Sequence, residues 1–424
     1  MIDINLLREE PKLFKASEKK RNRNPQVVDE ILELDEKWKK ELKKVEELKH
    51  QRNVVSEQIN QEKKAGKSAL AKIKEMREVV EEIKKRDEQA IFHLQQRDQL
   101  LTQIGNLMHP DVPAGKDDTQ NVEIKKVGKI PTFTFPLKTH VELAESLGIA
   151  DFEAAARVSG NGFYYLKKEL ALLNQALIRF AVDFMAKKSY DYIETPLMLN
   201  EKSIFASMDK AAIEQSVYAL KEDNLNLIGT AEQSLLAMHS AQTFLEKDLP
   251  KKYFSYSMCF RKEVGAHGIN DKGLWRTHQF NKIEQFIFCL PEQSDKFFQE
   301  LLHNSEEILK ALELPYHILE ICSGDMAVWK QRSYDIEVWR PTTKSYGEVM
   351  SLSNCTDFQA RKLGIKVAAP DGTKRIVHTL NNTALATSRI MVAILENNQT
   401  KEGFIKIPKA LWPYMGGIKE ISRK

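Results

Sequence analysis

The chain has 424 residues, of which 42% are hydrophobic and 29% are charged, and its formal net charge at pH 7 is only +4. This composition excludes an intrinsically disordered chain and supplies enough apolar residues for at least one large core within two or three domains. The small positive charge permits a polyanionic partner without requiring one. No segment is apolar for long enough to span a bilayer, so we expect no membrane association.

The four cysteines lie far apart and form no CxxC pair, and the histidines show no HxxxH or HExxH spacing. Neither a zinc site nor a disulfide framework is therefore predicted, and a reducing, cytoplasmic location is expected. The sequence also lacks GxGxxG and GxxxxGK[ST]. An ATP site, if present, would use neither a Rossmann fingerprint nor a P-loop.

In chain order, the first distinctive region is a charged helical segment from about residue 26 to residue 107. Apolar residues recur there at spacings of three and four. One stripe comprises Ile31, Leu34, Trp38, Leu42, Val45, Leu48, Val55 and Ile59, and a second comprises Ile73, Met76, Val80, Ile83, Ala90, Leu94, Leu101 and Ile104. Between the stripes, Gly66 can end one helix and Ser68 can cap the next. The pattern predicts an antiparallel two-helix coiled coil, with Asp87 and Arg97 as polar interruptions of its seam.

A break rich in proline and acidic residues, MHPDVPAGKDDTQN, follows the helical segment. It predicts a boundary between an N-terminal domain, residues 1–109, and a C-terminal domain, residues 110–424. Beyond the break, strand-like runs (YFSYSMCF, KIEQFIFCL, SYDIEVW) mix with helical runs (LALLNQALIRFAVDFMAKK, LLHNSEEILKALE) without a regular βαβ alternation. We therefore predict an α+β fold in which helices flank an antiparallel sheet.

Residues 253–288 carry the clearest chemical signal, because they predict two strands joined by a turn-rich loop, VGAHGINDKG. Alternation places Phe254, Tyr256, Met258 and Phe260 on one face of the first strand, toward the core, and Cys259, Arg261 and Glu263 on the other. On the returning strand one face carries Arg276, His278, Phe280, Lys282 and Glu284. Adjoining polar faces would suit a nucleotide and an amino acid, although a solvated, salt-bridged sheet surface explains the same alternation.

These two strands resemble motif 2 of class II aminoacyl-tRNA synthetases, and the form CFRKE followed by GLWRTHQFNKIEQF is similar to that of seryl-tRNA synthetases. Further segments resemble the same family in the same order: LIGTAEQSL at 227–235, EVMSLSNCTDFQARK at 348–362, HTLNNTALATSR at 378–389 and IPKALWPYMGG near the end. The resemblance covers essentially the whole chain, including MIDINLLREEP and the helical arm. The segment at 378–389 has less glycine than is usual in bacterial relatives, so archaeal or eukaryote-like relatives are expected.

The resemblance implies a serine-tRNA ligase that activates L-serine with ATP and transfers it to tRNA(Ser), with tRNA(Sec) as a further candidate substrate. It implies a serine site made of Thr230, Ala231, Glu232, Arg261, Glu284, Asn381 and Thr383. In that site Thr230, Glu232 and Glu284 would bind the serine ammonium. Thr383 would sense the serine hydroxyl, and buried partners for that hydroxyl would discriminate against alanine.

The resemblance likewise implies an ATP site made of Arg261, Lys262, Glu263, Arg276, Thr277, Phe280, Glu348, Val349, Met350, Ser351 and Arg389. Phe280 and Arg389 would stack on the two sides of adenine, and Glu263 would read its amino group. The catalytic residues would be Arg261, Arg276 and Arg389, which stabilise charge on the phosphates. Glu348 and Ser351 would hold Mg²⁺, but strict strand alternation puts them on opposite faces, so this assignment requires a bulge or a strand end.

Two further segments complete the resemblance. NNTALATSR predicts the start of a helix, with Asn381 and Asn382 near its cap. Residues 171–199 resemble motif 1, a long helix and a strand ending at Pro196, which forms the dimer interface in the family and implies a homodimer. Taken alone, the same residues also fit an amphipathic core helix followed by an edge strand.

The family uses its arm to grip tRNA, which implies phosphate contacts from basic residues of the arm. The candidates are Lys39, Lys40, Lys43, Lys44, Arg52, Lys63, Lys64 and Lys67. Because glutamates are interleaved with these lysines, a merely solvated coiled coil explains the charge pattern as well.

Three other identities are considered. A ligase that loads an amino acid onto a carrier protein would lack the arm. A paralogue without catalysis would have lost Arg261, Glu263, Glu284 or Arg389. A coiled-coil scaffold would leave everything after Pro110 unexplained.

Overall fold

The computed structural model describes residues 1–264 and 272–423. These residues form two compact units, Met1–Gly105 and Asn106–Lys424. The boundary between the units falls just before the proline-rich break in the sequence.

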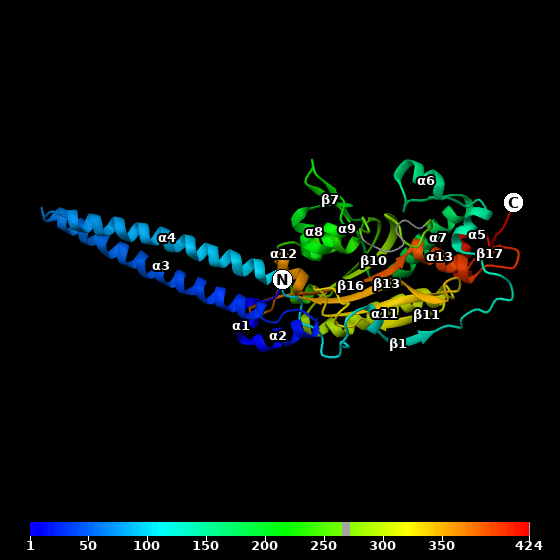
Figure 1. Cartoon of the computed structure of the whole chain (residues 1–424), viewed down its shortest axis with the longest axis horizontal. Coiled ribbons are helices and arrows are strands. Elements are labelled where there is room, and N and C mark those ends of the chain that lie inside the picture. The colour runs from blue at the N-terminus through cyan, green and yellow to red at the C-terminus, as the bar shows by residue number, and fades with distance from the viewer. Residues whose placement is uncertain (265–271, 424) are drawn as a thin grey trace. The chain divides into compact units, whose positions relative to one another are not determined.

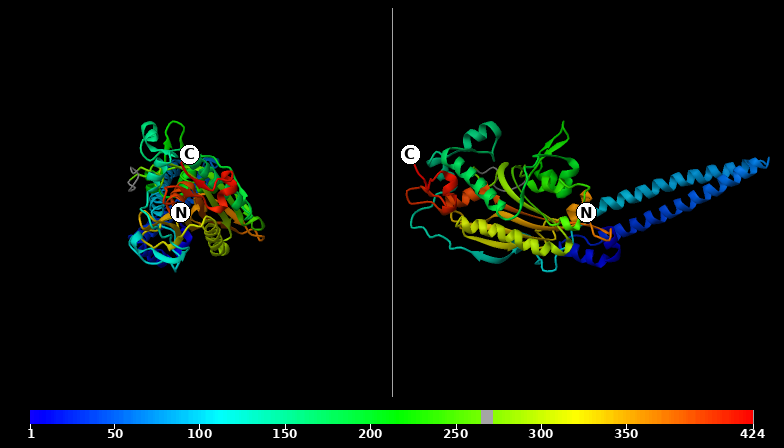
Figure 2. Two further views of the ribbon diagram at one scale, coloured as in Figure 1. Left: turned by 90° about the vertical axis from the view of Figure 1, so that its right-hand side faces the viewer. Right: turned by 180° about the vertical axis from the view of Figure 1, so that it is seen from behind.

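The first unit contains four helices, α1 (Ile4–Glu9), α2 (Pro11–Lys20), α3 (Val27–Lys64) and α4 (Leu70–Leu101). Helices α3 and α4 run antiparallel and side by side (Figures 1 and 2), which confirms the predicted coiled coil. In α4 the seam consists of Val79, Ile83, Ala90, Arg97 and Leu101, which lie at spacings of four and seven and are all buried. The seam departs from the predicted stripes at Val80, which is 45% exposed while Val79 is buried, and at Leu42 of α3, which is 38% exposed.

The turn between α3 and α4 corrects one sequence-based expectation. Gly66 follows the end of α3 with φ +70°, as expected of a glycine that ends a helix. Ser68 does not cap the next helix, because the N-cap residue of α4 is Ala69. Ala69 packs with Val55 and Ile59 in a small apolar cluster, so burial of its methyl group, and not a side-chain hydrogen bond, determines where α4 begins.

Close to α1 and α2, charged side chains stabilise the seam of the arm. The carboxylate of Asp35 is fully buried and accepts two hydrogen bonds from Arg8 and one from Arg97, all at 2.8 Å. Lys39 lies 3.0 Å from the same carboxylate, and the guanidinium carbon of Arg97 lies 4.9 Å from the ring centroid of Trp38. Burial alone would raise the pKa of Asp35, but the hydrogen bonds from these three cations outweigh burial and hold that pKa well below its usual range.

Among the described residues of the second unit, eight strands form one sheet in the order β1-β11-β12-β13-β16-β10-β9-β4. The strands are β1 (Val122–Val127), β11 (Tyr316–Glu320), β12 (Arg332–Arg340), β13 (Ser345–Thr356), β16 (His378–Ala386), β10 (Gln279–Cys289), β9 (Lys251–Phe260) and β4 (Asp191–Tyr192). Neighbouring strands are antiparallel except for β4 and β9, which are parallel. The predicted antiparallel sheet is therefore confirmed.

The two faces of the sheet are used differently, and the central strand β10 shows how. On one face Ile283 and Ile287 join the main core beneath α7 (Lys168–Ala186), α11 (Ser294–Ala311) and α13 (Thr387–Asn397). On the other face Phe286 and Phe288 join a second core with α10 (Ala231–Ala237) and α12 (Phe358–Leu363). Nearer the start of β10, the same face carries the polar residues Lys282 and Glu284. Figures 1 and 2 show α11 on one side of the sheet and α8 (Glu201–Ser207) and α9 (Lys210–Ser216) on the other.

The remaining elements are short. The helices are α5 (His140–Ser146) and α6 (Phe152–Ser159), with 3-10 turns η1 (Asp118–Gln120), η2 (Glu246–Asp248), η3 (Pro291–Gln293) and η4 (Lys409–Met415). The small sheets are β15 (Lys374–Ile376) with β14 (Lys366–Ala368) and β8 (Thr243–Leu245), β5 (Met198–Asn200) with β7 (Leu225–Leu227) and β6 (Ala219–Leu220), β2 (Ala150–Asp151) with β3 (Tyr165–Leu166), and β17 (Ile405–Lys406) with β18 (Glu420–Ile421). In residues 1–264 and 272–423 no helix is both long and apolar enough to cross a membrane.

The predicted strand pair needs two adjustments. Phe254 is fully buried in the main core and Tyr256 packs against it, whereas Met258 and Phe260 are only half-buried. Alternation does not continue to Glu263, because β9 ends at Phe260 and Glu263 has φ +51°. Most of the predicted turn-rich loop lies outside the described residues.

The helix predicted from NNTALATSR begins later than expected. Residues up to Ala386 belong to β16, and α13 starts at Thr387. Asn382 pairs with Gln285 of β10 and Leu352 of β13, and its side-chain amide donates to main-chain and side-chain oxygens of α11. These bonds on both sides hold the segment in the sheet, so Asn381 and Asn382 are not helix caps. The strand expected to end at Pro196 is likewise shorter, because β4 ends at Tyr192.

The buried Asp35 network predicts a site of charge-dependent stability in the arm. Asp35→Asn leaves Arg97 with one charged partner fewer in a buried position, so we expect local stability to fall by about 3 kcal/mol. Hydrogen exchange on the full chain should then show protection of α3 and α4 amides reduced by about 100-fold near residue 35. Because the folded-state pKa of Asp35 is depressed, its contribution is present above the unfolded pKa of about 3.9 and is lost as the pH falls below it.

Glu33→Gln is the matched control, because Glu33 forms an exposed ion pair with Lys37 on the same helix. Its protection pattern should equal that of the wild type, since exposed pairs contribute little. Equal protection in Asp35→Asn and Glu33→Gln would contradict the role given to the buried network.

Candidate active site

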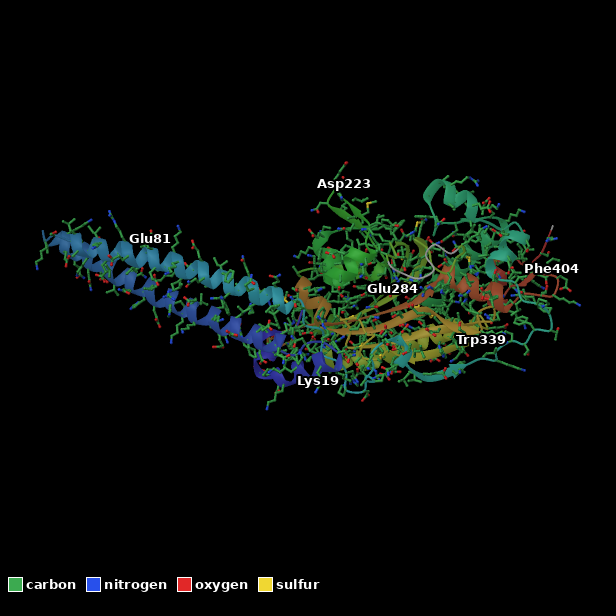
Figure 3. The ribbon with its side chains drawn as sticks, in the orientation of Figure 1. Lys19, Glu81, Asp223, Glu284, Trp339 and Phe404 are labelled. Atoms are coloured by element: carbon green, nitrogen blue, oxygen red, sulfur yellow. The ribbon has the colours of Figure 1, made fainter. Side chains whose placement is uncertain are left out.

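The polar part of the second sheet face forms the floor of a cavity of about 540 Å³. Its lining comes from α9, the start of α10, the segment that follows β9, the first half of β10, the segment before β12, β13, and the junction of β16 with α13. Among the described residues of this lining, five are cationic and four are anionic: Arg261, Arg276, Lys282, Lys330 and Arg389, and Glu232, Glu263, Glu284 and Glu348. Figure 3 labels Glu284, which lies inside the unit, and Asp223, which lies at the tip of the β6–β7 hairpin.

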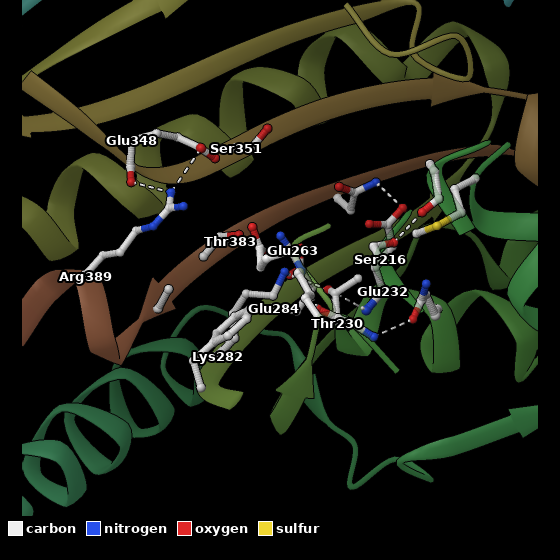
Figure 4. A pocket seen from close by; sticks show the side chains of 18 of the residues that line it. Ser216, Thr230, Glu232, Glu263, Lys282, Glu284, Glu348, Ser351, Thr383 and Arg389 are labelled. Carbon is white, nitrogen blue, oxygen red and sulfur yellow. Dashed lines mark hydrogen bonds and ion pairs between the residues drawn. The ribbon is translucent and has the colours of Figure 1, made fainter. Parts of the chain in front are cut away.

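One end of the cavity gathers two carboxylates, a lysine and a threonine (Figure 4). The Thr230 hydroxyl donates to the Glu284 carboxylate at 3.0 Å, and Lys282 Nζ lies 2.5 Å from the same oxygen of Glu284. Thr230 is also the N-cap residue of α10, where its hydroxyl accepts from the main-chain nitrogen of Glu232 at 3.3 Å. The helix start therefore places Glu232 and Thr230 side by side, facing β10.

Glu232 is unusual because its carboxylate is held by amide donors. Oε1 accepts hydrogen bonds from Gln359 at 2.7 Å and from Asn381 at 3.0 Å. Burial, and then repulsion from Glu284, raise the pKa of Glu232, while the hydrogen bond from Gln359 and the charge of Lys282 oppose that rise. This end of the cavity is therefore suited to a small cation such as an ammonium group, which relieves repulsion between the two carboxylates.

Thr383 joins this end of the cavity through the sheet register. It lies directly opposite Glu284 in the β10–β16 pair, so the two side chains share one face. The register shifts immediately beside this pair, next to Ile283. Thr383 is buried and lines the cavity, so its hydroxyl is close to where a small bound molecule would sit.

A second group of residues lies where β9 passes into the loop. Arg261 Nε donates to the Gly229 carbonyl at 3.2 Å, and its guanidinium carbon lies 5.3 Å from the ring centroid of Phe280. Glu263 accepts a hydrogen bond from Arg276 at 2.6 Å, which ties the two ends of the loop together. The arrangement provides an aromatic ring and two guanidinium groups in one place, as a nucleotide site requires.

The third group involves β13. A bulge at Val349 lies between the pairs Met350 with Ile336 and Glu348 with Glu337. Because of that extra residue, Glu348 and Ser351 both line the cavity, and the bulge that their joint assignment requires is present. Figure 4 shows Arg389 facing Glu348, and Arg389 Nη1 donates to both the carbonyl and the carboxylate of Glu348, at 2.6 and 3.0 Å.

Two cations contact the polar groups of β13: Arg389 pairs with Glu348, and Lys330 Nζ donates to Ser351 Oγ at 3.3 Å. Burial would raise the pKa of Glu348, but Arg389 outweighs burial and lowers it, so this carboxylate stays ionised. Asp335 lies opposite Ser351, and its Oδ1 atom is buried without a partner. Burial, followed by repulsion from Glu348, raises the pKa of Asp335 to about 7.

Within the described ranges, no cluster of three His, Cys, Asp or Glu side chains is arranged to hold a metal. Glu348 and Ser351 therefore fit a magnesium site only if phosphate oxygens supply further ligands, as is usual for this ion.

Most of the residues that sequence comparison with the family suggested lie together in the cavity. They are Thr230, Glu232, Arg261, Glu263, Arg276, Thr277, Phe280, Glu284, Glu348, Val349, Ser351, Asn381, Thr383 and Arg389. The side chains of Ala231, Lys262 and Met350 do not line it, and Ala231 and Met350 are buried in the two cores. Arg389 lies against Trp275, with 5.4 Å between its guanidinium carbon and the ring centroid.

The predicted serine and ATP sites left out several lining residues, among them Lys282, Trp275 and Lys330. For Lys282 a signal existed, because it alternates with Phe280 and Glu284 along the polar face of β10. Trp275 directly precedes Arg276 in the loop. Lys330 lies in an irregular segment before β12, where no periodicity marks it.

Two family models match the chain. Residues 1–108 match the seryl-tRNA synthetase N-terminal domain, and residues 217–398 match the tRNA synthetase class II core domain of the G, H, P, S and T enzymes. The serine-tRNA ligase of Methanocella arvoryzae is 44% identical over 423 residues, which are 99% of this chain and 100% of that protein. The archaeal relatives expected from the sequence are thus found.

Solved structures agree over the full length. The seryl-tRNA synthetase of Pyrococcus horikoshii complexed with ATP superposes with a TM-score of 0.95 at 40% identity and covers all of both chains. The cytoplasmic serine-tRNA ligase of Naegleria fowleri in complex with AMP gives a TM-score of 0.91 at 32% identity, over 100% of this chain and 99% of the other.

The Lys282–Glu284 pair predicts a measurable stability effect. Lys282→Met leaves two buried carboxylates without their nearest cation, so we expect the free energy of unfolding from urea titration at pH 7 to fall by about 3 kcal/mol. Lys188→Met, which removes one partner of the more exposed pair with Glu307, should cost at most about 1 kcal/mol. The double variant Lys282→Met/Glu284→Gln should recover part of the loss, and a double variant no more stable than Lys282→Met would contradict the pairing.

Proposed function

The chain belongs to the seryl-tRNA synthetase family, and from this premise we propose which of its residues activate serine and deliver it to tRNA. The serine-tRNA ligase of Methanocella arvoryzae is 44% identical in an alignment that covers 99% of this chain and 100% of that relative. This match makes the protein an aminoacyl-tRNA ligase that joins serine to tRNA(Ser) with ATP. The observation that carries the residue assignment is the cavity that unites side chains from four separate segments of the sequence. The carrier-protein ligase, the inactive paralogue and the scaffold are set aside by the same full-length match.

The serine subsite is proposed to lie at the end of the cavity that holds Glu232 and Glu284. The serine ammonium would bind the two carboxylates and the Thr230 hydroxyl, because a cation there cancels their repulsion. Thr383 would accept or donate a hydrogen bond at the serine hydroxyl. Alanine would leave these buried polar groups unpaired, which gives the discrimination its physical basis. Asn381 would act through Glu232.

The ATP subsite is proposed to extend from Phe280 to Arg389. Adenine would stack on Phe280, and Glu263 would accept from its amino group. Activation is an in-line attack of the serine carboxylate on the α-phosphorus, which needs no protein nucleophile. Arg261 would bridge the attacking carboxylate and the α-phosphate, and Arg276 would stabilise charge on the phosphates. Arg389 would stack on the side of adenine opposite Phe280.

A magnesium site at Glu348 and Ser351 forms part of the proposal. The bulge at Val349 and the ionised state of Glu348 support it. When bound, Mg²⁺ would neutralise phosphate charge, as a hard cation with oxygen ligands does. Arg389, which now donates to Glu348, would share that task.

We propose that the arm binds tRNA through its exposed basic residues. Lys40, Lys43, Arg52, Lys63, Lys64 and Lys67 are exposed, and Lys44 is partly exposed. Lys39 is a weaker candidate, because it is engaged with Asp35 and Glu36. Since a free cation neutralises phosphate better than a paired one, the outer part of the arm should dominate tRNA affinity. Measuring whether the protein charges tRNA(Sec) with serine tests that further substrate.

A homodimer is also proposed. Large apolar side chains are exposed on α7 and on the strands that precede and follow it in sequence, where Leu172 is 50%, Tyr165 49% and Tyr192 41% exposed. Such a group of large apolar residues is typical of a protein interface.

A cytoplasmic location fits the four cysteines, which are free and buried.

Arg261→Ala tests the proposed catalytic face. Serine-dependent exchange of pyrophosphate into ATP should fall by about 1000-fold, because the guanidinium stabilises charge on two reacting groups. Arg375→Ala, which removes an arginine exposed in a pair with Glu292, should leave the rate unchanged. The wild type should prefer serine over threonine, alanine, glycine and cysteine. Near-normal exchange in Arg261→Ala would overturn the assignment.

Shortening the arm separates its role from that of the cavity. Replacing residues 47–84 by a short glycine-containing turn keeps the Asp35–Arg97 and Glu41–Arg86 pairs and removes Arg52, Lys63, Lys64 and Lys67. Pyrophosphate exchange should stay within about twofold of the wild type, while kcat/KM for tRNA(Ser) charging falls by about 100-fold as phosphate contacts are lost. Unchanged charging would remove the outer arm from the mechanism.

A further inference from the structure

We propose that Gln359, a buried residue of α12, is a positioning residue for serine binding because its amide orients the carboxylate of Glu232. The inference rests on the function proposed above, in which Glu232 receives the serine ammonium. Gln359 lies in the segment SNCTDFQARK, and neither the sequence analysis nor the cavity lining gives this glutamine a role. Its side chain is fully buried and does not line the cavity, so it would act on serine only through Glu232.

The amide of Gln359 uses both of its ends. Nε2 donates to Glu232 Oε1 at 2.7 Å and to the Ser207 carbonyl at 3.1 Å. Oε1 accepts from the Thr379 hydroxyl at 2.8 Å. Because the carbonyl of Ser207 can only accept, the nitrogen of the amide must face Ser207 and Glu232. The partners therefore fix the amide orientation, and the donor is fixed toward the carboxylate.

This contact determines which oxygen of Glu232 remains for the substrate. Oε1 already accepts from Gln359 and from Asn381, which occupies both of its lone pairs. Oε2 is the oxygen left for an ammonium group in the cavity that Glu232 lines. A carboxylate held at one oxygen loses little freedom when the other binds, so the site is preorganised.

The supporting helix is itself anchored. Lys362, one turn after Gln359, donates to the carbonyls of Phe205 and Met208 at 2.8 and 3.0 Å. The Gln359 bond to Ser207 lies between those two carbonyls in sequence. Helix α12 is thus fixed against the end of α8, and the position of the Gln359 amide is fixed with it.

The charges around Glu232 disfavour a further carboxylate beside it. Glu284 disfavours the ionised form of Glu232, whereas Lys282 and Lys330 favour it. Burial, and then the charge of Glu232, raise the pKa of the Cys355 thiol. Burial raises the pKa of Glu232 most, and the Gln359 hydrogen bond lowers it. A glutamate at position 359 would add a third carboxylate to this group, whereas glutamine supplies a donor without charge.

The test compares two buried glutamines that each make three side-chain hydrogen bonds. Gln359→Met removes the donor to Glu232 at similar volume. Gln399→Met removes bonds to Lys138 and Glu396 from a residue outside the cavity lining, so it controls for the loss of a buried amide. In pyrophosphate exchange, Gln359→Met should raise KM for serine by about 10- to 100-fold and leave KM for ATP within about twofold. Gln359→Glu should raise KM for serine further, and Gln399→Met should change neither.

A ligand lacking the ammonium shows whether the effect passes through Glu232. A sulfamoyl analogue of seryl-adenylate and its desamino counterpart are titrated calorimetrically into the wild type, Gln359→Met, Glu232→Gln and the double variant. Gln359→Met should weaken the amino analogue by about 10- to 100-fold and leave the desamino analogue unchanged. The double variant should bind the amino analogue no more weakly than Glu232→Gln alone, because both changes remove one interaction.

The pH profile supplies a readout that a purely structural residue would not change. Loss of the Gln359 donor favours protonated Glu232, so the acid limb of kcat/KM for serine should shift to higher pH in Gln359→Met and stay in place in Gln399→Met. Equal weakening of both analogues, or additive losses in the double variant, would overturn the role of Gln359. Absence of serine-dependent exchange in the wild type would instead overturn the proposed function.

Discussion

Two carboxylates, Glu232 and Glu284, are buried in one cavity, and the surrounding residues are arranged around the cost of placing them there. Burial and mutual repulsion raise the pKa of Glu232. Lys282 lies against Glu284, and two amides hold Glu232. Charges kept apart from water are stable only when such partners are present. Because Glu232 and Glu284 still repel each other, the cavity favours a small ammonium group beside them. The energetic constraint on the fold is therefore also the basis of recognition.

The sheet meets this constraint by dividing one face between two tasks. Along β10, Phe280, Lys282 and Glu284 line the cavity, and the next residues on that face, Phe286 and Phe288, enter a core. Strand alternation fixes the face, but register shifts decide which neighbours reach the cavity. The bulge at Val349 brings Glu348 to the same side as Ser351, and a second shift lies beside the Glu284–Thr383 pair. A regular sheet with the same sequence would separate these groups.

The sequence predicted the coiled coil, the antiparallel sheet and the class of the site, because each has a periodic or motif-level signal. Alternation alone identified the polar face of Phe280, Lys282 and Glu284, while family resemblance supplied the roles of distant segments. Failures occurred where tertiary contacts outweigh local preference: Ala69 and not Ser68 is the N-cap residue of α4, and Asn381 lies in a strand and not at a helix cap. Gln359 had no local signal, since its function depends on partners from three other elements.

Buried residues are distributed unevenly along helix α3, and this distribution affects how the arm can bend. On α3, Val28, Ile31 and Asp35 are buried within the first turns, whereas Val45 and Val55 follow at intervals of ten residues. On α3, buried side chains are therefore denser near its start than along its middle, whereas on α4 they recur at spacings of four and seven. The central span of α3, where buried residues are fewest, is therefore the part of the arm that we expect to bend most easily. A bound macromolecule could be accommodated by elastic bending of that span, without breaking the charge cluster around Asp35.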